Sequence, residues 1–181
     1  MRTIADECGR GLRPRPPERP HSENLRLNRL TEKPATFFIT KLLHPKKPIL
    51  EPATRELIIS ALEFSIREKR IFLRAFVIMP DHWHGLFALR EPWTLPKFLH
   101  GMMSFVAAKT SALLKAHQSS WQDGYYDTRV KTAKQFAFIT RYIEQNPVSR
   151  GLVDQPEQWE ASSANRTDLI TDPWPWIVGE E

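Results

Sequence analysis

Along this 181-residue chain, some stretches have the hydrophobic pattern of a strand and others repeat apolar residues with the period of a helix. Three stretches are rich in β-branched and aromatic residues and predict strands: residues 35–44, 71–80 and 82–90. Three others repeat apolar residues at intervals of three and four and predict amphipathic helices: residues 51–70, 95–118 and 131–146. Residues 121–130 predict a fourth strand or extended segment. Pro147 is expected to end the last helix after Asn146.

The predicted order is β-α-β-β-α-β followed by a helix, which is an α+β, ferredoxin-like split βαβ arrangement with an additional C-terminal helix. Only Pro80 and Asp81 separate the second and third strands, which predicts a hairpin. We expect one domain over residues 34–153. Residues 1–33 are basic and proline-rich and are expected to be disordered, and residues 154–181 predict an aromatic tail that packs on the domain.

Composition narrows the function classes. The single cysteine, Cys8, excludes a disulfide framework within the chain and favours a reducing compartment. No apolar run reaches the roughly 18 residues of a membrane span, and no signal peptide is evident, so a cytoplasmic protein without membrane contact is expected. The net charge of +5 suggests an anionic partner, most often nucleic acid.

Two histidines interrupt the third predicted strand. His82 and His84 are separated by one residue, so both imidazoles project to one face of a strand while Trp83 projects to the other. Such a pair can chelate one divalent ion, and Asp81 beside it can orient a histidine. The stretch lacks the further His or Cys of a closed structural zinc site, which leaves coordination positions open for catalysis. An ordinary buried histidine pair is the alternative.

The last predicted helix carries Tyr142 and, four residues later, Asn146, so both lie on one helix face. A tyrosine can attack phosphorus when the developing charge is stabilised, and a carboxamide oxygen can bind a hard metal. The alternatives are a tyrosine at the edge of the core and a helix-terminal asparagine.

Basic and aromatic residues gather in the chain around these motifs. No acidic residue lies between Glu91 and Asp123. Basic side chains that follow phosphates, together with aromatic rings that stack on bases, hold single-stranded nucleic acid. The candidates for DNA contacts are Lys97, Lys109, Arg129, Lys131, Trp121 and Tyr126. Two solvated helix faces and a set of core aromatics are the alternative reading.

Several motifs together resemble the Y1 transposases. "MPDHWHGLFAL" resembles their HUH motif of two histidines around a bulky hydrophobic residue, and "RYIEQNPVSRGLV" resembles the segment with their single catalytic tyrosine. "WQDGYYDTRV" resembles the stretch between these motifs, and "DPWPW" resembles a short aromatic tail. The resemblance covers roughly residues 35–176 and is strongest to the REP-associated tyrosine transposases, relatives of the IS200/IS605 enzymes. Thr128 stands where the family often has His.

The resemblance implies a catalytic domain over residues 34–153, in which His82, His84 and Asn146 bind Mg²⁺ or Mn²⁺ and Tyr142 is the nucleophile. Gln145 ranks second to Asn146 as third ligand because it points off the shared helix face. The implied reaction is cleavage and transfer of single-stranded or hairpin DNA through a 5′-phosphotyrosine. Two alternatives remain open: a DNA-binding regulator that does not cut, and a metal-dependent phosphodiesterase that uses water. The chain would act as a monomer or a homodimer.

Overall fold

The computed structural model describes residues 35–44, 49–114 and 121–172. Within these ranges it contains four strands and three α-helices: β1 (Thr36–Leu42), α2 (Pro52–Arg67), β2 (Ile71–Ile78), β3 (His82–Leu89), α3 (Leu95–Leu114), β4 (Tyr126–Val130) and α4 (Ala133–Ser149). Two short 3₁₀ helices follow, η1 (Pro156–Gln158) and η2 (Thr167–Leu169). The N-terminal tail, residues 1–33, lies outside the described residues.

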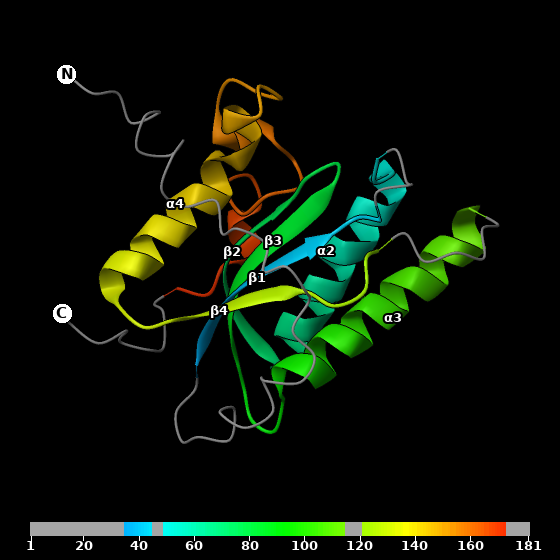
Figure 1. The fold of residues 1–181 in the computed structure, drawn as a ribbon, viewed down its shortest axis with the longest axis horizontal. Helices are drawn as coiled ribbons and strands as arrows, with labels where there is room; N and C mark the ends of the chain where they lie inside the picture. The colour runs from blue at the N-terminus through cyan, green and yellow to red at the C-terminus, as the bar shows by residue number, and fades with distance from the viewer. Residues whose placement is uncertain (1–34, 45–48, 115–120, 173–181) are drawn as a thin grey trace.

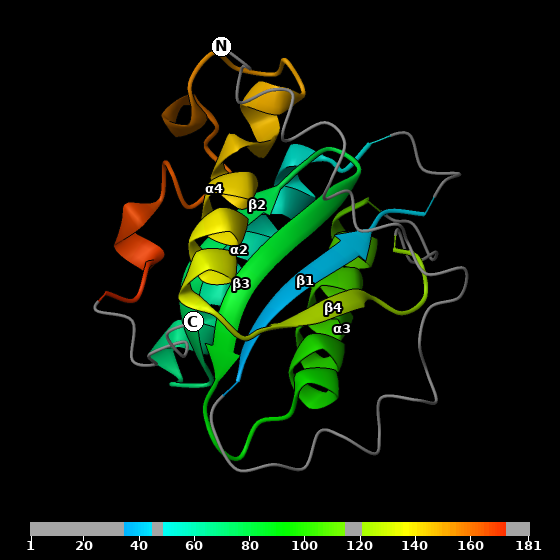
Figure 2. The same cartoon turned by 60° about the vertical axis from the view of Figure 1, so that its left-hand side comes forward.

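The strands form one antiparallel sheet in the order β2-β3-β1-β4. Helices α2 and α3 cover one face of this sheet and α4 covers the other (Figure 1, Figure 2). This order and layering confirm the predicted α+β, ferredoxin-like fold with an additional helix. None of the helices among the described residues is long and apolar enough to cross a membrane.

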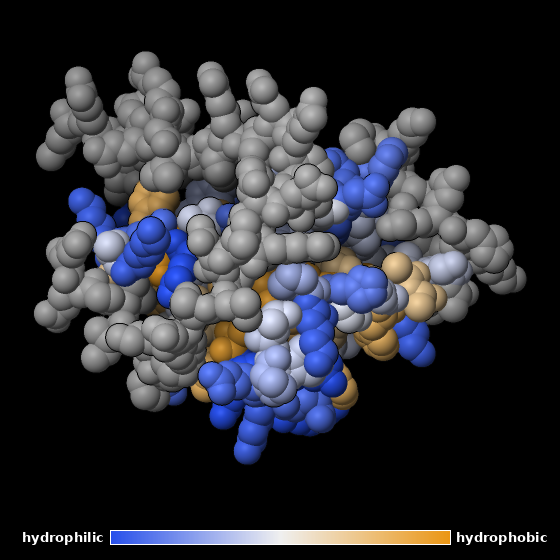
Figure 3. Space-filling view, turned by 60° about the horizontal axis from the view of Figure 1, so that its bottom comes forward, coloured by the Kyte–Doolittle hydropathy of each residue, from blue (hydrophilic) through white to orange (hydrophobic). Residues whose placement is uncertain are grey.

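Two hydrophobic clusters lie on opposite faces of the sheet. The larger cluster packs under α2 and α3 and includes Ile39, Leu62 and Trp83. The smaller one packs under α4 and includes Leu86 and Ile143. Burial of each such side chain contributes roughly 1.5–3 kcal/mol to folding. In the view of Figure 3, hydrophilic residues cover much of the described surface and apolar residues show as separate small patches.

Strand β3 contributes to both clusters because its side chains alternate between the two faces of the sheet. Every residue of β3 is buried. Trp83 enters the cluster under α2 and α3, whereas Leu86 enters the cluster under α4. His82 and His84 share the face of Leu86, so the predicted separation of the two histidines from Trp83 is confirmed.

Helix α4 is longer than predicted, and the expectation that Pro147 ends it was wrong. The helix continues through Pro147 to Ser149. It ends in a Schellman arrangement, in which the N–H of Gly151 donates to Val148 O (2.9 Å) and the N–H of Leu152 donates to Pro147 O (3.0 Å). Gly151 has φ of 66°, which glycine adopts without strain. A proline so near the end removes only one hydrogen bond, so the helix tolerates it.

Two smaller boundaries also differ from the sequence prediction. The β2–β3 connection has three residues, 79–81, and is closed by a hydrogen bond from Met79 N to His82 O of 2.7 Å. Only residues 126–130 of the predicted stretch 121–130 form a strand. The segment before it is held by Lys41, a buried lysine whose ammonium donates to the carbonyls of Gln122 and Gly124. Burial lowers the pKa of Lys41.

The chain after α4 passes along the outer edge of β2. The N–H of Ile78 donates to Ala161 O and the N–H of Ser163 donates to Phe76 O, both at 2.8 Å. The indole N–H of Trp159 donates to Ile78 O at 3.1 Å. This part of the predicted aromatic tail therefore covers what would be a bare sheet edge. The "DPWPW" tryptophans lie outside the described residues.

Candidate active site

His82 and His84 lie side by side on the sheet face that α4 covers. Their ring centroids are 4.5 Å apart and the rings meet edge to face. Both residues are buried: 5% of the surface of His82 and 4% of the surface of His84 is exposed. Two buried histidines in contact need partners for their ring nitrogens, because an unpaired buried polar atom costs free energy.

Each histidine has one ring nitrogen engaged. His82 Nδ1 lies 2.6 Å from Asp81 Oδ1, and His84 Nδ1 lies 2.9 Å from the hydroxyl oxygen of Thr40. These bonds fix the orientation of both rings, and neither of them uses Nε2, the nitrogen that would bind another ligand. A histidine that binds a metal is held in this way by a carboxylate or another polar group on its second nitrogen.

The contacts also shift the pKa values of Asp81 and His84. The hydrogen bond to His82 lowers the pKa of Asp81 to about 2, and the charge of Arg150, 3.5 Å away, acts in the same direction. Burial, and then the positive charge on His82, lowers the pKa of His84 well below its usual value. His84 is therefore neutral near pH 7, as a metal ligand must be.

Tyr142 comes to the pair from α4. Its ring centroid lies 5.4 Å from that of His84, and it meets the ring of Phe38 edge to face at 6.1 Å. The start of α4 is fixed by Thr132, whose hydroxyl accepts a hydrogen bond from Gln135 N at 3.2 Å. Ile143, fully buried against the sheet, holds the same turn of the helix in place.

Asn146 lies one turn further along α4. The helix touches β3 through Tyr142 and His84, and it meets the residue before β3 through the ion pair of Arg150 with Asp81. Asn146 is between these two contacts along the helix, and it is 7% exposed. Its Oδ1 is buried and accepts no hydrogen bond from any described residue. An unpaired buried carboxamide oxygen on this face of the helix is the kind of atom that a hard cation binds.

The alternative ligand Gln145 lines a cavity on the other flank of α4, which agrees with the expected direction of its side chain. Among the residues that the structure describes, no group of three or more His, Cys, Asp or Glu side chains could hold a metal ion. A metal site here would therefore use two imidazoles and the amide oxygen of Asn146, with open positions for a substrate.

The candidate DNA-contact residues fall into different parts of the fold. Tyr126 lies on the site face, because it pairs with Thr40, which pairs in turn with His84. Lys131 is exposed just before α4. Trp121 is buried in the cluster under α2 and α3, 6% exposed, so its ring is not a surface for base stacking.

The remaining three basic candidates are exposed but do not join the site. Arg129 pairs with Phe37, which places it on the sheet face opposite the histidines. Lys97 and Lys109 lie on α3, which also covers that opposite face. These three residues are close to the motifs in the sequence but not in the folded chain.

Sequence reasoning missed three residues of the site. Arg150 lies four residues after Asn146 and eight after Tyr142, so helical spacing alone could have found it. Phe38 and Thr40 lie on β1, and their contacts depend on the strand order. Nothing local in the sequence gives the register that sets Thr40 opposite His84.

Comparisons with known proteins find relatives of this chain. The family model for IS200-like transposases matches residues 39–146. The REP-associated tyrosine transposase of Escherichia coli K12 is 25% identical over 138 residues, which are 74% of this chain and 79% of that protein. A solved REP-associated tyrosine transposase bound to a REP hairpin superimposes with a TM-score of 0.63 at 21% identity, covering 83% of this chain and 90% of that one. The matched segment begins in β1 and ends at Asn146.

Proposed function

Because the chain belongs to the IS200-like transposase family, we propose that it cleaves and rejoins single-stranded DNA through a 5′-phosphotyrosine on Tyr142. The observation that carries the proposal is the contact of the Tyr142 ring with His84, at 5.4 Å between centroids, within one chain. A tyrosine beside a histidine pair with open coordination positions has the parts that nucleophilic attack at phosphorus needs.

His82, His84 and Asn146 would hold a divalent cation such as Mg²⁺ or Mn²⁺. When bound, that cation polarises the scissile phosphate and offsets the charge that develops on its oxygens. Three features of this chain support the ligand set: the engaged Nδ1 atoms of both histidines, the low pKa of His84, and the unpaired Oδ1 of Asn146.

Tyr142 would make and break the bonds of the reaction. Its Oη attacks phosphorus, so an Oη–P bond forms while the bond from phosphorus to the 3′ oxygen of the preceding nucleotide breaks. The tyrosine loses its proton to solvent, and the 3′ oxygen takes one up to become a hydroxyl. A 3′-hydroxyl can later attack the phosphotyrosine and restore a phosphodiester. One ester replaces another in each step, so no nucleotide cofactor is required.

Hairpin DNA is the proposed substrate class. The structural relative is described as bound to a REP hairpin, and the chain is basic overall. Of the predicted contact residues, Tyr126 lies on the site face and Lys131 is exposed just before α4, so we propose that Tyr126 stacks on a base and Lys131 meets a phosphate.

A covalent-trapping assay tests the proposal. Labelled single-stranded hairpin DNA is incubated with the protein and Mn²⁺ and analysed on a denaturing gel. We expect a labelled protein band that is lost with chelator and in Tyr142→Phe but kept in Tyr125→Phe, a matched control outside the site. Cleavage that survives in Tyr142→Phe would support the water-using phosphodiesterase. DNA binding without cleavage by the unmodified chain would support the regulator.

A further inference from the structure

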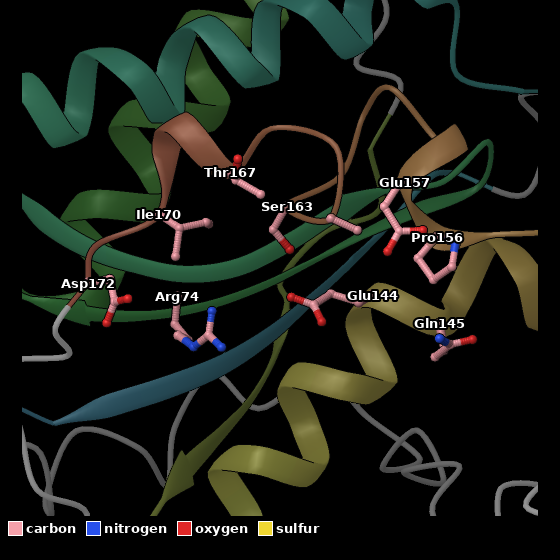
Figure 4. Close-up of a pocket in the computed structure, with 10 residues that line it drawn as sticks. Arg74, Glu144, Gln145, Pro156, Glu157, Ser163, Thr167, Ile170 and Asp172 are labelled. Atoms are coloured by element: carbon pink, nitrogen blue, oxygen red, sulfur yellow. The ribbon is translucent and has the colours of Figure 1, made fainter.

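A cavity lined by charged and polar residues lies on the flank of α4 opposite to Tyr142. It is a cavity of about 360 Å³, within the range of small-ligand sites. Helix α4, strand β2, η1 and the segment after η1 form its walls (Figure 4). Glu144 enters it from α4, two residues after Tyr142, and about one helix diameter, roughly 10 Å, separates the two flanks.

A β-bulge makes room for this cavity. The pairing of β2 with β3 shifts between Leu73 and Ala75, so Arg74 is the extra residue. A bulge redirects the side chain that it carries, and Arg74 lines the cavity. The chain that follows α4 bonds to β2 on either side of the bulge, from Ser163 N to Phe76 O and from Thr171 N to Leu73 O, both 2.8 Å. Between these bonds it moves away from the strand and forms the outer wall.

The polar groups of the cavity are only partly used by the protein. Ser163 is 2% exposed, and its Oγ is buried without a hydrogen-bond partner among the described residues. Figure 4 shows this hydroxyl, the guanidinium of Arg74 and the carboxylate of Glu144 turned toward one space. No ion pair within 4 Å joins Arg74 to Glu144 in the described part of the chain. A buried hydroxyl without a partner is what a site has when its ligand is absent.

The charged side chains that line the cavity determine which kind of ligand it can bind. Three carboxylates, of Glu144, Glu157 and Asp172, surround the single guanidinium of Arg74. Such a set repels a phosphate and favours a neutral ligand with several N–H donors and at least one acceptor edge. Glu144 is half-buried; this burial raises the pKa of its carboxyl group, and the charge of Arg74 acts in the opposite direction.

We propose that this cavity binds a guanine base of the DNA strand that Tyr142 cleaves; the inference rests on the proposed function. Guanine offers N1–H and N2–H₂ as two neighbouring donors, which match the two oxygens of the Glu144 carboxylate. Its O6 and N7 match a guanidinium, which is the commonest specific contact to guanine. Ser163 can bond to a remaining edge atom. Bases drawn out of a stack are read on these same edges.

Binding to a short strand with one variable base tests the proposal. The probe is a labelled oligothymidylate of about 12 nucleotides that contains one central dG, dT, inosine or 7-deazaguanine. We expect dG to bind about tenfold more tightly than dT. Inosine lacks the 2-amino group and 7-deazaguanine lacks N7, so each is expected to lose most of this gain.

Variants assign the preference to the cavity. Glu144→Gln is expected to abolish the preference for dG over inosine, and Arg74→Met the preference for dG over 7-deazaguanine. Glu56→Gln, on the exposed surface of α2, is the matched control and should keep both. Thermal unfolding of each variant checks that the fold is intact. Equal binding of dG and dT, or a dG preference that survives Glu144→Gln, would overturn the proposal.

Two further experiments distinguish a guanine base in DNA from a free nucleotide, and this inference from the proposed cleavage. Free guanosine monophosphate that binds as tightly as the dG strand would overturn the assignment to DNA. Tyr142→Phe should keep the base preference, because it leaves the cavity intact. A covalent adduct without a dG preference would refute this inference alone, whereas a dG preference without an adduct would refute the proposed cleavage alone.

Discussion

Replacement of Asn146 by leucine is expected to stabilise the protein and to remove its activity. The two side chains have similar size, and Asn146 is 7% exposed with a buried Oδ1 that has no partner in the described structure. An unsatisfied buried acceptor costs about 1–3 kcal/mol, which leucine does not incur. We therefore expect the free energy of unfolding in chelator to rise by about 1–3 kcal/mol, and Tm by about 2–4 °C for each kcal/mol.

The response to a divalent ion should separate the two proteins further. A ligand at 100 times its Kd stabilises the form that binds it by about 2.7 kcal/mol. The unmodified chain should gain stability with Mn²⁺, whereas Asn146→Leu should gain much less. Asn165→Leu is the matched control, because this exposed asparagine already donates to Glu157 O at 2.8 Å. It should show no gain in chelator, only a loss of about 0.5–1.5 kcal/mol from the missing hydrogen bond, and it should keep the full response to Mn²⁺.

Urea unfolding of the three proteins, with chelator and with Mn²⁺, measures these differences. A loss of 1 kcal/mol or more for Asn146→Leu in chelator would mean that the amide already makes a stabilising bond. A full Mn²⁺ response in that variant would mean that the cation binds elsewhere. Either result would refute the assignment of Asn146 as a metal ligand.

Three further perturbations follow from the same contacts. Thr40→Val removes the hydrogen bond to His84 and should weaken Mn²⁺ binding by about 10–100-fold, measured by titration calorimetry, while Thr40→Ser should restore it. Gly85→Ala places a Cβ 2.6 Å from the buried ring of Trp83 and should lower the free energy of unfolding by about 1–3 kcal/mol in urea. Asp81 has a pKa lowered to about 2, so its ion pair should stabilise the fold above about pH 4. That contribution, at most about 1 kcal/mol because the carboxylate is half exposed, should fade between about pH 4 and 2 in acid unfolding and be absent in Asp81→Asn.

The fold and the centre of the site could be predicted because local periodicity determines them. Alternation in β3 separates His82 and His84 from Trp83, and helical spacing aligns Tyr142 with Asn146. Contacts between distant segments could not be read in this way. Trp121 is buried where the chain just after β1 and the chain before β4 meet at the Leu43–Trp121 bridge, a pairing that composition does not reveal.

The end of α4 shows a second limit of local reasoning. Proline is a strong local stop signal, but here the Schellman bonds at Gly151 set the end of the helix. The cavity beside Glu144 depends on a bulge at Arg74 and on a loop more than 80 residues later in the sequence. Each of these features requires the register of particular strands.

The most direct test of the central claim is to find which tyrosine carries the DNA. The chain has three tyrosines, so the answer is discrete. Trypsin should release Tyr142 in the peptide "YIEQNPVSR", apart from Tyr125 and Tyr126. Mass spectrometry of the trapped and nuclease-treated complex should find a nucleotide bound through its 5′ phosphate to this peptide. A nucleotide on the peptide with Tyr125 and Tyr126, or cleaved DNA with no modified peptide, would contradict Tyr142 as the nucleophile.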